Sequence, residues 1–168
     1  QAIIDAHGDD LAAIVMEPIR NIEPEPGFIE GVRTLANKSG AVLVMDEISA
    51  GFRYTTGGAH LALHTVSPDI AVVSKALGNG YPIAAVIGCG SVMQAAQHTF
   101  ISSTNWTERI GPVAALATIR KHQDEHVAEH IQTLGGIVQE GWKKTAGKHG
   151  IAVHVGGMKP MSHFSFET

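Results

Sequence analysis

Three side chains that can do chemistry, two carboxylates and one amine, each come at or just after the end of an apolar run of strand length. The runs and the side chains that follow them are 11–16 with Glu17, 41–45 with Asp46, and 69–73 with Lys75. Continuous apolar runs are typical of strands buried on both faces, as in parallel sheets covered by helices. Because ligands bind beyond the carboxyl ends of such strands, we expect the three side chains along one edge of a sheet.

A lysine at such an edge has three chemical uses. It can hold a phosphate as a point charge, pair with a carboxylate, or act as a nucleophilic amine. Spacing alone does not choose among these uses. For an isolated pair, a structural ion pair between Lys75 and Asp46 or Glu17 is the ordinary expectation.

The segments between the runs predict the elements that position this edge. Residues 27–38 carry apolar side chains at helical spacing, and Gly40 lies where a helix C-cap is expected. The result is a strand–helix–strand unit, for which a right-handed connection is the rule. The apolar run at 83–88 follows Lys75 too closely for a long crossover helix, so an antiparallel strand fits there.

The second half of the chain reads as helical and then as strand. Residues 111–149 have a helical pattern, in which the pair Gly135-Gly136 predicts a break. Residues 151–155 and 164–166 have the pattern of strands in a later unit. The coarse prediction is an α/β fold.

Composition excludes several classes of protein. The formal net charge is -4 and the basic residues form no stripe, which gives no electrostatic reason to expect nucleic acid or an anionic membrane as partner. No apolar run approaches the length of a membrane span. The single cysteine, Cys89, fits a reducing compartment, so a cytoplasmic location is expected. Both ends fall within periodic segments, and we interpret the chain as a portion of a longer protein.

The residues around Asp46 and Lys75 resemble class III pyridoxal-phosphate (PLP) aminotransferases. Residues 46–53, DEISAGFR, resemble the family segment D-E-V-x-x-G-F-G/R, and residues 74–83, SKALGNGYPI, resemble S/G-K-x-x-x-G-G-x-P-x. Two further matches, Glu17-Pro18 ahead of Gly27-Phe28 and the sequence SPDI at 67–70, occur in the family's order. Residues 51–59 and 102–109 look closest to the glutamate-1-semialdehyde 2,1-aminomutase branch.

The resemblance implies a fold and an activity. Residues 1–146 would form part of a three-layer large domain of fold type I, with a mostly parallel sheet, and residues 147–168 the start of a small C-terminal domain. The implied protein is a homodimeric transaminase that moves an amino group between an amino acid or amine and an oxo acid or aldehyde through a Lys75 aldimine. The alternatives are an aminomutase, which transfers the group within one molecule, and a catalytically silent fragment.

The resemblance also implies roles for particular residues toward the cofactor, PLP. Lys75 is expected to form the imine and to move the proton, while Asp46 faces the pyridine nitrogen. Ile48, two residues after Asp46, is expected on the same side of an extended chain and against one face of the ring. Ser49 stands where many members have a glutamine near the ring hydroxyl. Thr104 is expected to reach the phosphate of the neighbouring subunit's cofactor. Glu17 is expected near the mouth of the active site.

Other patterns carry less weight. The sequence HQDEH at 122–126 fits an H-x-x-E-H zinc motif, and His130 extends it along one face of a helix. The segment is polar throughout and no further ligand stands out, so no metal site is expected. A nucleotide-binding G-x-G-x-x-G loop fails because Ile83 stands where its last glycine belongs. Arg53 is equally consistent with a substrate-carboxylate site and a structural role.

Overall fold

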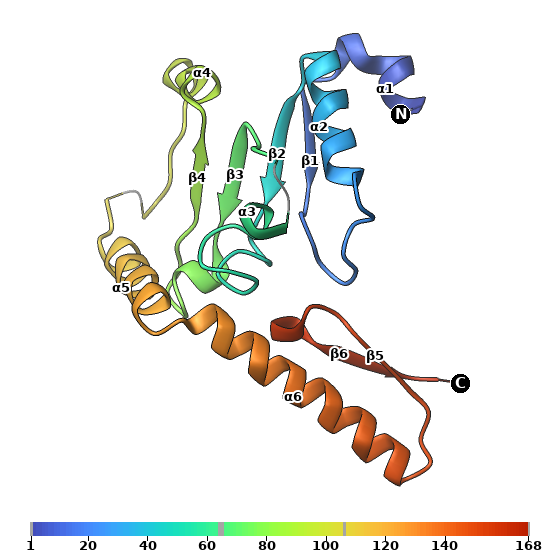
Figure 1. Cartoon of the computed structure of the whole chain (residues 1–168). Helices are drawn as coiled ribbons and strands as arrows, with labels where there is room; N and C mark the ends of the chain where they lie inside the picture. Colours follow the sequence, from blue (N-terminus) through green and yellow to red (C-terminus); the bar gives the residue numbers. More distant parts are fainter. Residues whose placement is uncertain (1, 64–65, 106, 168) are drawn as a thin grey trace.

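The centre of the computed structural model is a four-stranded sheet (Figure 1), and the structure describes residues 2–63, 66–105 and 107–167. The strands lie side by side in chain order: β1 (Ala13–Met16), β2 (Val42–Asp46), β3 (Ile70–Val73) and β4 (Ala85–Gly88). The first three strands are parallel, and β4 is antiparallel to β3. The α/β prediction and the antiparallel fourth strand are confirmed.

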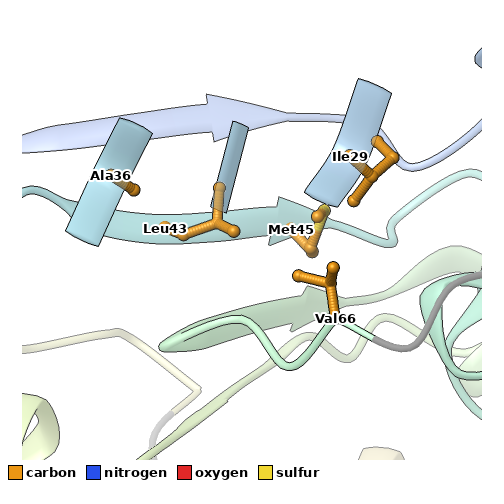
Figure 2. Packing of buried hydrophobic residues seen from close by; sticks show 5 residues of the cluster. All are labelled: Ile29, Ala36, Leu43, Met45 and Val66. Atoms are coloured by element: carbon orange, nitrogen blue, oxygen red, sulfur yellow. The ribbon is translucent and has the colours of Figure 1, made fainter. Parts of the chain in front are cut away.

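Helix α2 (Phe28–Ser39) connects the first two strands and covers one face of the sheet. Its end is set by Gly40, whose left-handed backbone (φ 69°) turns its amide back to the carbonyls of Ala36 and Asn37. The core between helix and sheet consists of a cluster of fully or almost fully buried side chains (Figure 2): Ile29, Ala36, Leu43, Met45 and Val66. Burying each of the larger ones contributes about 1.5–3 kcal/mol, so this cluster fixes α2 on the sheet.

The register of the sheet defines two faces with different surroundings. Ile14, Leu43, Ala71 and Ile87 share the face on which α2 packs. The opposite face carries β-branched side chains from all four strands, and Val15 and Val86 are each more than half exposed there. Within the described residues this second face has the apolar character of a covered sheet, in agreement with fold type I.

Asp69 connects neighbouring elements at the end of the sheet where the strands begin, opposite the edge with Asp46 and Lys75. Its carboxylate accepts hydrogen bonds from the Leu43 amide at 2.7 Å and from the Arg33 guanidinium of α2 at 2.8 Å. Partial burial, the largest influence, raises the pKa of the Asp69 carboxyl, but the Leu43 amide and Arg33 together outweigh it and hold the pKa below its usual value. Asp69 therefore ties β2, β3 and α2 together where the strands begin.

The long helical stretch is two helices, α5 (Ile110–Asp124) and α6 (Val127–Lys148). The chain breaks at His126, which has a left-handed backbone (φ 50°), so the predicted break at Gly135-Gly136 is wrong. Gly135 lies inside α6, and a glycine is needed there because a Cβ would come within 2.0 Å of the Lys159 carbonyl oxygen. It serves close packing against the 3₁₀ helix η4 (Lys159–Met161) rather than chain reversal.

The same break separates the histidines of the zinc-like motif. His122 is buried in α5, where its ring meets Phe52 edge-on at 5.5 Å, while His130 lies in α6 beyond the break. The three histidines therefore do not share one helical face. Among the described residues, no three His, Cys, Asp or Glu side chains are grouped so that they could hold a metal ion.

Beyond α6 a separate antiparallel pair forms, β5 (Val153–Gly156) and β6 (His163–Phe166). Its link to the main body includes Met158, which packs with Ile19, Ala50 and Ala59. The predicted domain boundary at 146/147 falls in the last turn of α6 and remains a prediction.

The other elements are α1 (Ala2–His7), η1 (Gly8–Asp10), α3 (Ala59–Leu63), η2 (Lys75–Leu77), α4 (Gly90–Met93) and η3 (Gln94–His98). None of the helices in the described part is long and apolar enough to span a bilayer.

Candidate active site

The structure brings Asp46 and Lys75 to the same edge of the sheet. Asp46 is the last residue of β2 and pairs with Val72 of β3, and Lys75 follows β3 after one intervening residue. The backbone amide of Glu47 donates to the Val72 carbonyl at 2.8 Å, which continues the pairing past the end of β2. Because these strands are parallel and adjacent, their ends place a carboxylate and an amine at one edge of the sheet.

Lys75 has an unusual backbone conformation. Its φ of 47° is in the left-handed region, which costs a non-glycine residue about 1–3 kcal/mol and is found preferentially at functional sites. The turn is held from both sides, because Ser74 Oγ donates to the Ile83 carbonyl at 2.8 Å and Leu77 is buried. Gly78 is required for close approach, since a Cβ there would come within 2.1 Å of the Tyr81 carbonyl oxygen.

The amine of Lys75 is bound to a hydroxyl rather than to a carboxylate. Lys75 Nζ donates to Ser49 Oγ at 2.9 Å, and the lysine itself is exposed. None of the salt bridges recorded between described residues involves Lys75. An ion pair with Asp46 or Glu17, which is the ordinary expectation for an isolated pair, is not among the interactions recorded for the described residues, and Lys75 stays exposed at the edge.

Asp46 is half-buried and lies on the face of the sheet opposite α2, since it alternates with Met45. Its Oδ1 accepts a hydrogen bond from the Ile48 amide at 3.0 Å. Residues 48–50 form a turn, so the chain is not extended at Ile48 and the predicted extended segment from Asp46 to Ile48 is wrong. The expected contact of Ile48 with a ring stays a prediction on other grounds.

The turn that carries Ser49 is fixed by its neighbours. The guanidinium of Arg53 donates to the Ser49 carbonyl at 2.7 Å, and the Gly51 amide donates to the Glu47 carbonyl at 2.8 Å. Gly51 tolerates no side chain, because a Cβ would come within 2.8 Å of the same Glu47 oxygen. In this structure Arg53 acts on the turn, which agrees with the structural alternative for this residue.

Two residues that the sequence did not single out lie directly behind this turn. Glu47 is completely buried, and its carboxylate accepts hydrogen bonds from the Ala59 amide, the His60 amide and His60 Nδ1. The signal for Glu47 was its position next to Asp46, because alternation sends the two carboxylates to opposite sides. Nothing near His60 in the sequence indicated its partner.

The other two predicted residues, Glu17 and Thr104, have no hydrogen bond or ion pair with this group among those recorded for the described residues. Glu17 pairs with Arg20 at 2.8 Å, and its second carboxylate oxygen is buried without a hydrogen-bond partner among the described residues. Thr104 is exposed in the segment between η3 and α5. No recorded interaction of the described residues joins either side chain to Lys75 or Asp46, and their roles stay predictions.

Comparison with known proteins gives the same family as the motifs. The profile of the family described as Aminotransferase class-III matches residues 1–164. The 3-aminobutyryl-CoA aminotransferase of Cloacimonas acidaminovorans is 35% identical over 99% of this chain and 42% of its own length. The glutamate-1-semialdehyde 2,1-aminomutase 2 of Brevibacillus brevis is 33% identical over 88% of this chain and 36% of its own length.

Solved structures agree. The FumI protein of Sphingopyxis sp. MTA144, described as its PLP internal aldimine form, superposes on 99% of this chain with a TM-score of 0.92 and 26% identity. An omega-transaminase from Sphaerobacter thermophilus superposes on 99% of the chain with a TM-score of 0.86 and 26% identity. These alignments cover 41% and 40% of the two proteins.

The chain is therefore an α/β protein of the PLP-dependent transferase fold, with an amine and a carboxylate at the carboxyl edge of its sheet. It belongs to the class III aminotransferases. It spans about two-fifths of the length of the first of the relatives above.

Proposed function

We propose that the protein containing this chain is a PLP-dependent transaminase in which Lys75 is the cofactor lysine. The observation that carries the proposal is the state of the Lys75 amine. Lys75 is exposed, has a left-handed backbone, donates through its amine to Ser49, and lies at the same edge as Asp46. Within the part of the chain that the structure describes, none of the recorded salt bridges involves it. A lysine used only for structure would be expected to pair with the nearby carboxylate.

The residues present fit the group that the family implies. PLP requires an amine that can reach its aldehyde and a carboxylate for its ring nitrogen, and Lys75 and Asp46 are of those types. Asp46 ends β2 and Lys75 follows β3, and the turns beside them are closely packed at Gly51 and Gly78, which leave no room for a side chain. When bound, PLP supplies the electron sink that makes the bond between the substrate carbon and its hydrogen acidic.

Each residue then has a definite task. Lys75 holds the cofactor and afterwards accepts and returns the proton at Nζ. Asp46 keeps the ring nitrogen protonated, because a carboxylate beside a titratable nitrogen favours its charged form. Ser49 orients Nζ through its hydroxyl, and Ile48 is proposed to pack on the ring. Glu17 is proposed to lie at the mouth of the site.

The proposed reaction transfers an amino group from a small-molecule amino donor to an oxo acid or aldehyde acceptor. Its support is the family membership and the transaminase names among the relatives, such as that of the Cloacimonas protein. The alternative is intramolecular transfer, as in the name of the Brevibacillus relative.

The first test is chemical labelling of the product of the complete reading frame that contains this chain. The protein is mixed with PLP, reduced with borohydride, digested and analysed by mass spectrometry. We expect a phosphopyridoxyl group on Lys75, with Lys143 and Lys148 unlabelled. A folded protein that carries the label elsewhere, or no label, contradicts the assignment and supports a catalytically silent protein.

We also propose a homodimer with the active site at the subunit boundary, on the basis of the role expected of Thr104. Sedimentation of the complete product should give twice the monomer mass, and Thr104→Ala should weaken PLP binding without dissociating the dimer. An active monomer would refute this proposal. A cytoplasmic location is proposed from the unpaired Cys89, which is exposed.

A further inference from the structure

The buried carboxylate of Glu47 is the most unusual group near the site that has no task in the proposed reaction. Its side chain has no exposed surface, and three N–H groups from residues 59 and 60 point at it, at 2.8, 2.9 and 2.5 Å. A carboxylate is costly to bury unless it is fully hydrogen-bonded, and here both oxygens have donors. Because an ionised carboxylate only accepts, the His60 imidazole must carry its proton on Nδ1.

Gly58 leaves no room for a side chain of its own beside this pair. A Cβ on Gly58 would come within 2.6 Å of the His60 ring and 3.0 Å of Glu47 Oε1. His60 itself is buried, with only 6% of its surface exposed. The glycine, the imidazole and the carboxylate therefore form one closely packed unit behind the end of β2.

This unit is connected to both reacting groups through short stretches of backbone. Glu47 directly follows Asp46, and its amide is bound to Val72 of β3. The Glu47 carbonyl accepts the Gly51 amide, and between these residues lies Ser49, whose hydroxyl holds Lys75 Nζ. A shift of Glu47 would therefore displace the Asp46 carboxylate and the partner of the Lys75 amine together.

We propose that Glu47 and His60 are positioning residues that set the placement of Asp46 and Ser49 relative to the cofactor. Among the described residues, no recorded hydrogen bond or ion pair joins the side chain of either residue to Lys75 Nζ or to the Asp46 carboxylate. Their role is to anchor the loop from Glu47 to Gly58 against α3, so that Asp46 and Lys75 keep a fixed mutual geometry. This inference deepens the proposed function and rests on it.

The test compares three variants of the complete holoprotein with a control. Glu47→Gln has the shape of the native side chain but only one acceptor oxygen. His60→Phe keeps an aromatic ring, of somewhat larger volume, and removes the Nδ1 donor, and His60→Gln restores a side-chain donor. The control is Asp69→Asn, which weakens the opposite edge of the same strands without touching the site. All are measured well below their unfolding temperatures.

The decisive readout is the pH midpoint of the visible absorption band of bound PLP, because a purely structural role would leave it unchanged. We expect Glu47→Gln to move the midpoint by about one pH unit and to lower kcat by about 10- to 100-fold, with a smaller change in KM. His60→Phe should act in the same direction, and His60→Gln should recover part of the effect. Asp69→Asn should lower the unfolding temperature and leave the midpoint unchanged.

The opposite results are equally clear. If Glu47→Gln and His60→Phe lower the unfolding temperature but keep the wild-type midpoint and kcat, the pair only stabilises the fold and the inference is overturned. If Glu47→Gln does not fold, His60→Phe decides alone by the same criterion. A wild-type protein without the label on Lys75 overturns the proposed function, and this inference with it. If Lys75 is labelled but the variants keep the wild-type midpoint and kcat, only this inference is overturned.

Discussion

Replacing Lys75 by alanine is expected to lower kcat for amino transfer by at least about 10⁴-fold, because the change removes both the attachment point of PLP and the group that moves the proton. The fold should persist, since the side chain is exposed and makes one recorded hydrogen bond, to Ser49. Loss of the left-handed lysine costs the native state little, as alanine meets the same steric resistance at φ 47°. Single-turnover kinetics with a small amine and circular dichroism measure the two effects separately.

Two matched variants sharpen this result. Lys75→Arg keeps a positive charge that could hold a phosphate but has no nucleophilic amine, so it should be as inactive as Lys75→Ala. Lys144→Ala changes an exposed lysine of α6, far from the site in sequence and fold, and should retain wild-type turnover. Near-normal activity of Lys75→Arg would show that the lysine acts as a point charge and would refute the assignment.

The second large effect is expected from Asp46→Asn. The asparagine oxygen can still accept the Ile48 amide, so the turn should persist, but the negative charge is lost. An opposite charge beside a titratable group shifts its pKa by about 1–3 units, and the protonated fraction of the ring nitrogen should fall accordingly. We therefore expect kcat to drop by about 10- to 1000-fold at neutral pH, with a smaller loss at lower pH.

The sign of the pH effect makes this prediction specific. Without the carboxylate the ring nitrogen binds its proton more weakly, so a lower pH partly restores the protonated ring and the activity. The pH–rate profile of the variant should therefore shift toward lower pH. Asp124→Asn, in the last turn of α5, is the matched control and should leave the profile unchanged. An Asp46→Asn variant with wild-type turnover across the pH range would exclude Asp46 as the partner of the ring nitrogen.

Local sequence was sufficient for the elements and for the two principal residues. The four apolar runs became the four strands, and the distance between Lys75 and the run at 83–88 correctly indicated an antiparallel partner for β3. Strands that end in Asp46 and near Lys75 meet at one edge because parallel neighbours share their direction. This inference required only the order and length of the apolar runs.

Glycine positions predicted the ends and breaks of helices only in part. Gly40 ends α2 as expected, because a left-handed C-cap is a local requirement of the backbone. Gly135 gives no break, since its small size is demanded by the Lys159 backbone, which arrives from 24 residues further along the chain. The true break at His126 gave no clear sequence signal, because most non-glycine residues, histidine included, usually avoid the left-handed conformation, although histidine adopts it more often than most.

The amino-acid sequence by itself determined the α/β architecture, the family, and the placement of Asp46 and Lys75 at one edge of the sheet. Only the tertiary structure decided what each side chain touches: Lys75 binds Ser49 rather than a carboxylate, Arg53 holds the Ser49 turn, and Glu47 is buried against His60. The reason is physical. Strand periodicity and chain order are set by neighbours along the chain, whereas hydrogen-bond partners are selected by the closure of loops, for which sequence carries no regular period.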